Sequence, residues 1–86
     1  MERMVESITL YRTEGVLMAV EVEADALSRV LRKMGVRLLL KRHAETRKQV
    51  MVAGFPDQEP WRSAALQRLE REDVPVRIID GPPVFA

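Results

Sequence analysis

The residues VLMA at positions 16–19 recur in similar form as VMVA at positions 50–53, and each run is followed by a stretch with helical spacing. VRLL at 36–39 is echoed in the same way by VRII at 76–79. Short apolar runs with alternating side chains are typical of strands, because successive residues of a strand point to opposite faces. Each half of the chain is therefore predicted to fold as strand, helix, strand.

Helical spacing and helix-breaking residues place the two helices. An apolar stripe with steps of three and four predicts the first helix over 25–34, formed by Leu27, Val30, Leu31 and Met34. Gly35 stands where a helix C-terminal cap belongs. The second helix is predicted over 58–72, with Pro60 in its first turn. Its sheet-facing side is expected to carry Trp61, Ala64, Ala65 and Leu69.

The remaining segments predict five strands, at 7–13, 16–22, 36–43, 49–55 and 76–80. Glu14-Gly15 is predicted to form a two-residue hairpin turn between the first two strands, and a second turn is expected around 44–47. The two tandem strand–helix–strand units are similar in topology to the ferredoxin-like arrangement over about residues 16–80. Because many unrelated functions share that topology, the resemblance implies a fold and no chemistry.

The predicted fold class is α+β: a two-layer sandwich of element order ββαββαβ, with a ferredoxin-like-related sheet and two helices on one face. The first strand does not fit a pure ferredoxin-like sheet, because a two-residue turn cannot step over an intervening strand. Two arrangements stay open. Either the last strand is displaced outward, or segment 7–13 does not pair as a hairpin.

The length of 86 residues predicts a single domain, 1–86. Within it we distinguish the N-terminal hairpin 7–22, the second strand–helix–strand unit 49–80 and the tail 81–86. A hydrophobic fraction of 47% with 31% charged residues is typical of a globular protein. No apolar run reaches the roughly 18 residues that span a bilayer, and the first residues are acidic, so a cytoplasmic protein without membrane association is expected.

Two residue types are missing from the chain. The absence of cysteine excludes disulfides and cysteine-based zinc sites. The absence of asparagine, together with eleven Arg against three Lys, is compatible with a heat-adapted source, although a GC-rich genome produces much of the same bias.

No residue pattern for catalysis, cofactor binding or metal binding is found. The single histidine, His43, lies beside Lys41 and Arg42, which supply no second ligand. Glu21, Glu23 and Asp25 could form a carboxylate column, but an acid in the first turn of a helix has a structural role there. The four glycines are isolated and form no phosphate-binding loop. We therefore predict a protein that is not an enzyme and holds no cofactor or metal.

The sheet face opposite the helices is predicted to be an association surface. Alternation places a set of apolar residues there: Leu17, Ala19, Leu39, Met51, Ala53, Phe55 and Ile79. The charged or polar rim around them would consist of Glu21, Arg37, Lys41, Gln49 and Arg77. An apolar centre with a charged rim is typical of interfaces. Self-association as a homo-oligomer, or binding of a partner through this face, is the favoured function; a ligand sensor of the kind built on ferredoxin-like dimers stays open.

The alternative function is nucleic-acid binding through a basic segment. Between residues 29 and 48 eight basic residues stand against the single acid Glu45, a local charge of +7, whereas the flanks 1–28 and 49–86 carry −4 and −2. The residues proposed to bind a polyanion are Lys41, Arg42, Arg47 and Lys48. Alternatively, these cations have a purely structural role and form ion pairs with Glu21, Glu23 and Asp25, which the predicted topology places at the same end of the sheet.

Overall fold

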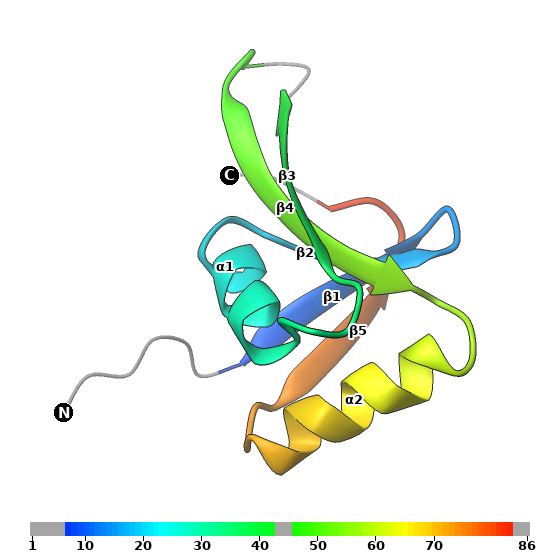
Figure 1. Ribbon diagram of the computed structural model, residues 1–86. Coiled ribbons are helices and arrows are strands. Elements are labelled where there is room, and N and C mark those ends of the chain that lie inside the picture. Colours follow the sequence, from blue (N-terminus) through cyan, green and yellow to red (C-terminus); the bar gives the residue numbers. More distant parts are fainter. Residues whose placement is uncertain (1–6, 43–45, 84–86) are drawn as a thin grey trace, which may run out of the picture.

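The computed structural model describes residues 7–42 and 46–83, and Figure 1 shows their arrangement. The element order is ββαββαβ, as predicted. The seven elements are β1 (Ile8–Thr13), β2 (Val16–Val20), α1 (Glu21–Val30), β3 (Arg37–Arg42), β4 (Gln49–Pro56), α2 (Trp61–Arg71) and β5 (Val76–Asp80). The protein is thus α+β, with a five-stranded mixed sheet and two helices.

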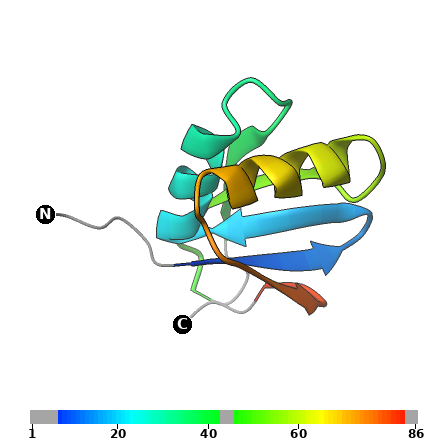
Figure 2. The same cartoon turned by 90° about the horizontal axis from the view of Figure 1, so that it is seen from below.

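The strands lie in the order β3-β4-β2-β1-β5. Every neighbouring pair is antiparallel except β1 and β5, which run parallel. The open question of strand order is therefore answered: β1 and β2 form a hairpin, and the last strand is displaced outward to pair with β1. Figure 2 shows both helices on the same side of the sheet. The opposite side is called the open face below.

The β1–β2 hairpin is closed by the predicted two-residue turn. Glu14 and Gly15 both have positive φ, 51° and 80°. Positive φ at both central residues is the geometry whose twist matches that of paired strands, and glycine adopts it without steric cost. The register places Thr13 opposite Val16 and Tyr11 opposite Met18.

Helix α1 begins and ends four residues earlier than predicted. The strand β2 stops at Val20, and Glu21, with a φ of 59°, turns the chain directly into the helix. The backbone N–H of Thr9 in β1 donates a hydrogen bond of 2.9 Å to the side chain of Glu23 in the first turn of α1. A non-glycine residue with positive φ is uncommon, and for this reason the sequence did not reveal the boundary.

Helix α2 is three residues shorter than predicted at its start and one at its end. Ala65 and Leu69 are buried against the sheet, as expected, and Leu66 packs partly against the core. Trp61 and Ala64 were predicted to face the sheet and instead are exposed, Trp61 by 45%. Positions 62, 65, 66 and 69 form the stripe nearer the sheet, one residue away from the predicted one.

The core lies between the helices and one face of the sheet. Leu17 and Phe55 are opposite each other on β2 and β4, and Ala19 and Ala53 form the next pair. All four are buried, together with Leu27 of α1. Because the side chains of the two alanines are small, α1 can pack close to the centre of the sheet. Ala24 of α1 is fully buried at this contact.

Candidate binding surface

The open face follows from the strand register, because residues paired across neighbouring strands point to the same side. One row runs from Arg37 through Gly54, Met18 and Tyr11 to Ile79. The row beside it includes Leu39, Val52 and Val20. The strand residues on this face include three cations, Arg37, Lys41 and Arg77. Among the described strand residues no acid shares the face, since Asp80 lies on the helix side opposite Arg12.

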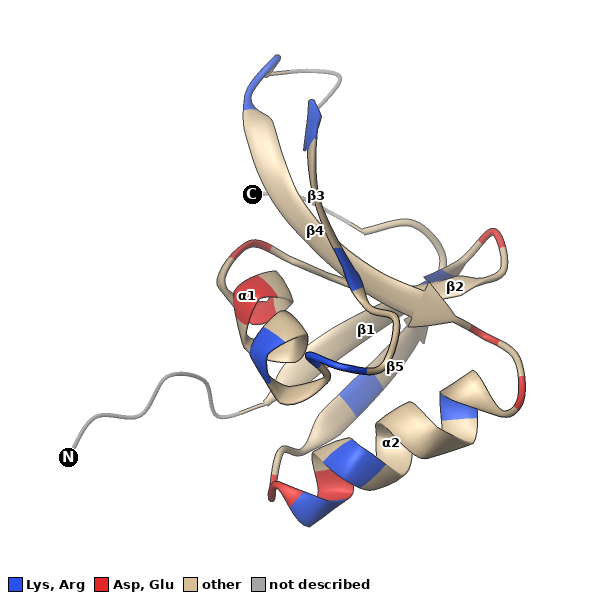
Figure 3. Ribbon diagram, in the orientation of Figure 1, with Lys and Arg blue, Asp and Glu red and all other residues tan. Residues whose placement is uncertain are grey.

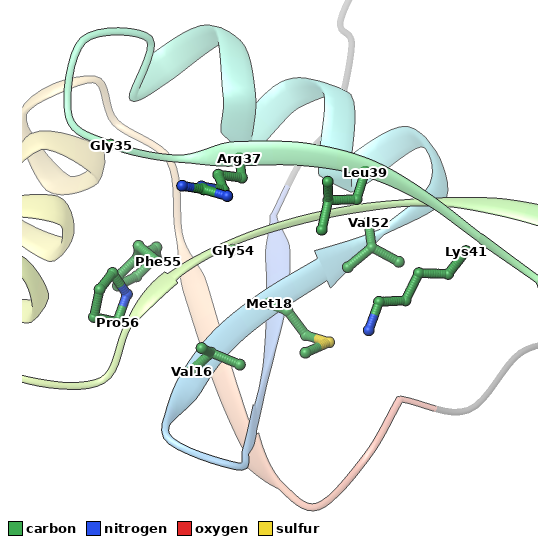
Figure 4. Close-up of a pocket in the computed structure, with 10 residues that line it drawn as sticks. All are labelled: Val16, Met18, Gly35, Arg37, Leu39, Lys41, Val52, Gly54, Phe55 and Pro56. Carbon is green, nitrogen blue, oxygen red and sulfur yellow. The ribbon is translucent and has the colours of Figure 1, made fainter.

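A groove with a volume of about 300 Å³ lies on the open face where β2, β3 and β4 meet. Figure 4 shows the side chains of Met18, Leu39 and Val52 around this hollow, with Lys41 reaching toward it from β3. Val16 and Pro56 extend the apolar lining at one end. Gly54 also lines the groove and, having no side chain, does not fill it. The surface is therefore apolar at its centre and positively charged along β3.

Four of the six residues predicted to form the interface are in the core instead. Leu17, Ala19 and Ala53 are fully buried and Phe55 is 2% exposed, all on the face that the helices cover. Met51 is also on that side, half-buried against the core. The assignment of these five residues to the open face was wrong. Alternation separates two sets of residues along a strand but does not say which set the helices will cover.

The residues of β3 and β5 that were predicted to lie on the open face do lie there. Leu39 lies on the open face and is 48% exposed. Arg37, Lys41, Arg77 and Ile79 share that face, as expected. The residues that the sequence analysis missed are Val16, Met18 and Val52, which line the groove. Their signal was present in the sequence, because residues 16, 18 and 20 are as apolar as residues 17 and 19.

Residue Glu21 was expected on the rim of the open face and lies in the first turn of α1. Gln49 was expected there as well. It is opposite Arg42 in the β3–β4 pairing, on the side of the sheet that Met51 occupies. Neither residue belongs to the candidate surface.

The basic hairpin residues come together at one end of the molecule. Lys41 and Arg42 end β3, and Arg47 and Lys48 precede β4, where Gln49 is the partner of Arg42. Figure 3 shows the positive charge at this end of the β3–β4 ribbon. All four residues are exposed. His43 and Glu45, within the same connection, lie outside the described residues.

The predicted pairing of these cations with the acids of the first helix is not observed. Asp25 forms its ion pair with Arg29, one helical turn further along α1, and Glu23 binds the Thr9 backbone. Within residues 7–42 and 46–83 no ion pair joins Glu21, Glu23 or Asp25 to the hairpin cations. The reason is the early start of α1, which removes the acids from the strand on which they were expected.

A network of ion pairs and hydrogen bonds lies at the start of α2. Arg62 binds Asp57 and Glu59, each at 3.1 Å, and the Ser63 hydroxyl donates to Glu59 at 2.7 Å. The hydrogen bond from Ser63 lowers the pKa of Glu59, and the bond to Asp57 raises the pKa of Arg62. The backbone N–H of Asp57 donates to Gly15 at 2.9 Å. Asp57, Glu59 and Arg62 each have at least one partner in this network, which ties the β4–α2 connection to a position beside the β1–β2 turn.

In the part of the chain that the structure describes, no three acidic or histidine side chains converge as they would around a metal ion. None of the described helices has the length and apolar character to cross a bilayer.

Comparison of the chain with known protein families, with characterised proteins and with solved structures found no match.

Proposed function

We propose that this chain is a non-enzymatic binding domain that holds an acidic, partly apolar surface of another protein against its open sheet face. The observation that carries the proposal is the groove, in which an apolar floor at Met18 and Val52 adjoins the cations of β3. The sheet is interpreted as a ferredoxin-like arrangement into which β1 is inserted between β2 and β5, a relation that by itself implies no chemistry.

Charge is the reason to favour another protein over a second copy of this chain. Two open faces brought together would place Arg37, Lys41 and Arg77 of both copies in one interface, with no acid among the described strand residues of either face. Like charges that lose water in an interface oppose association. An acidic partner gains from the same three cations. A homo-oligomer through this face is retained as an outcome that the experiments below can detect.

The anionic, apolar dye anilinonaphthalene sulfonate is a suitable probe of this surface under native conditions. We expect its fluorescence to rise on binding, and we expect Lys41→Glu to weaken binding at least about tenfold, the equivalent of one charge-assisted contact. Leu39→Glu should have a similar effect, because it places a carboxylate beside the sulfonate. The measurement is a fluorescence titration.

The matched control is Arg71→Glu, the same change of charge at an exposed position on α2. It should leave the affinity for the dye unchanged. Equal weakening by Lys41→Glu and Arg71→Glu would show an effect of net charge alone and would contradict the proposal. A mass of two chains by light scattering, reduced to one by Leu39→Glu, would reassign the surface to self-association.

Nucleic-acid binding is the second candidate, favoured by one observation. Lys41, Arg42, Arg47 and Lys48 lie together at the end of the β3–β4 ribbon, and no ion pair among the described residues neutralises them. Four neighbouring cations can contact phosphates without reading a sequence.

A single-stranded oligonucleotide tests this candidate. If the four cations bind phosphates, the logarithm of the binding constant should fall with the logarithm of salt concentration by about 0.7 per phosphate contacted. Arg42→Glu with Arg47→Glu should then abolish binding and leave the free energy of unfolding nearly unchanged, because neither residue forms an ion pair with another residue of 7–42 or 46–83. We expect weak binding that disappears near physiological salt. Submicromolar affinity at about 150 mM salt would place this candidate first.

A further inference from the structure

We infer that the outer edge of β3 takes an extended acidic segment of a partner protein as a sixth strand of the sheet. The inference rests on the proposed function and adds the mode of binding and the pattern of the partner. It starts from the position of β3, which is the end strand of the sheet and pairs only with β4. The edge strand of a sheet presents backbone N–H and C=O groups to which another strand can bond.

The exposure of β3 is the second observation. All six residues from Arg37 to Arg42 are exposed, including three consecutive leucines. Leu38, Leu39 and Leu40 are 45%, 48% and 64% exposed. Consecutive leucines on an end strand leave apolar side chains uncovered on both sides of the sheet. A strand added beside β3 would cover both sets at once, whereas a ligand confined to the open face would cover only Leu39.

The charges of β3 define the partner. On the open face Leu39 lies between Arg37 and Lys41, and on the other side Leu38 and Leu40 are followed by Arg42. Side chains directly opposite each other on paired strands are about 5 Å apart, and opposite charges at that separation attract. The complementary strand therefore has three central apolar residues, one acid at the end beside Arg37, and two acids at the end beside Lys41 and Arg42.

A second copy of β3 does not have this pattern. In an antiparallel pair of two β3 strands Arg37 would face Lys41 or Arg42 of the other copy, and like charges directly opposite destabilise a sheet. The charges that oppose this pairing are those that attract an acidic strand. The other end strand, β5, does not share the preference, because it carries both Arg77 and Asp80 and its Asp80 already binds Arg12 at 3.0 Å.

The groove continues the same surface. Leu39 and Lys41 belong both to the edge strand and to the lining of the groove. Side chains of an added strand that point to the open face would lie beside Leu39, next to the hollow in front of Met18 and Val52. The edge and the groove would thus be occupied by one partner.

A synthetic peptide tests the inference directly. The probe is the fluorescein-labelled, amidated hexapeptide Glu-Glu-Val-Leu-Val-Glu, which has the complementary pattern in antiparallel order. We expect it to bind the full chain, as measured by fluorescence anisotropy, and we expect the peptide Val-Leu-Glu-Glu-Glu-Val of equal composition and charge, whose acids would face the three leucines, to bind at least about tenfold more weakly. A variant in which Arg37, Lys41 and Arg42 are all replaced by Glu should lose affinity for the acidic probe and should bind the peptide Lys-Lys-Val-Leu-Val-Lys instead.

Backbone methylation separates strand addition from other modes of binding. Alternate residues of an added strand direct their N–H groups toward β3 and away from it. Two versions of the probe, methylated on the two alternate sets of backbone nitrogens, should therefore differ, one losing at least about tenfold in affinity and the other binding nearly as well as the parent. This difference would not arise if only side chains made contact.

The outcomes distinguish the inference from the proposed function. Equal binding of the two methylated peptides, or no binding of the parent peptide while the dye still binds, would overturn strand addition and leave the open-face proposal standing. Failure of both the dye and the peptide would overturn both. A mass of two chains that Leu40→Glu reduces to one would show that a second β3 occupies the edge, against the inference.

Discussion

Replacing Phe55 with alanine is expected to lower the free energy of unfolding by about 3–5 kcal/mol, the largest effect of any single substitution considered for this protein. Phe55 is 2% exposed and lies opposite Leu17 at the centre of the core. Its removal loses the burial of an aromatic ring and leaves a cavity that the rigid strands β2 and β4 cannot close. A domain of this size has a total stability of roughly 5–15 kcal/mol, so the variant would retain little of it.

Chemical denaturation monitored by circular dichroism measures this loss. The matched control is Leu39→Ala on the open face, where half of the side chain is already in water, and its expected cost is within about 1 kcal/mol. The pair of variants tests which face of the sheet the helices cover. Equal costs at the two positions would contradict the assignment of Phe55 to the core and Leu39 to the surface.

Replacing Gly54 with alanine is expected to cost about 1–3 kcal/mol, the magnitude of an overpacked core. A Cβ atom at this position would lie 2.9 Å from the backbone oxygen of Leu17 and 3.3 Å from Cβ of Met18. The nearer of these atoms belongs to the backbone of the paired strand, which cannot move away without separating β2 from β4. The same substitution would also reduce the depth of the groove beneath Arg37.

The sign of this effect is informative, because alanine elsewhere in a strand is more stable than glycine by roughly 0.5–1 kcal/mol. Unchanged or increased stability of Gly54→Ala would mean that the two strands are not in close approach at this point. Gln49→Ala, at an exposed position of the same strand, should change the free energy of unfolding by less than about 0.5 kcal/mol. Thermal and chemical denaturation of the three proteins provide the comparison.

The sequence by itself determined the elements of this protein and their order. Alternation of apolar residues located all five strands to within two residues, because a strand must separate its two faces wherever one of them is buried. The pair Glu14-Gly15 identified the hairpin, since glycine accepts the positive φ that the turn requires. The stripe around Leu27 and Leu31 identified the buried side of the first helix, although not its ends.

The sequence predicted the β3 part of the candidate surface correctly and the β2 and β4 part incorrectly. Arg37, Leu39 and Lys41 were assigned to the open face correctly, because charged residues at alternate positions of a strand place that side of the strand toward water. The β2 and β4 residues were assigned to the wrong side, because both alternating sets are apolar there. Residues 16, 18 and 20 would have made an equally acceptable core by composition.

Local sequence patterns do not specify which set of residues the helices cover, where β5 pairs or which of the described charges form ion pairs. Each of these depends on contacts between residues far apart in the chain. The turn at Glu21, where a non-glycine residue adopts positive φ, sets the direction in which α1 leaves the sheet and so brings its Ala24 and Leu27 over Leu17 and Ala19. The same turn removes Glu23 and Asp25 from the hairpin cations. Local sequence preferences specify the period of a strand, and the packing of the helices specifies its buried side.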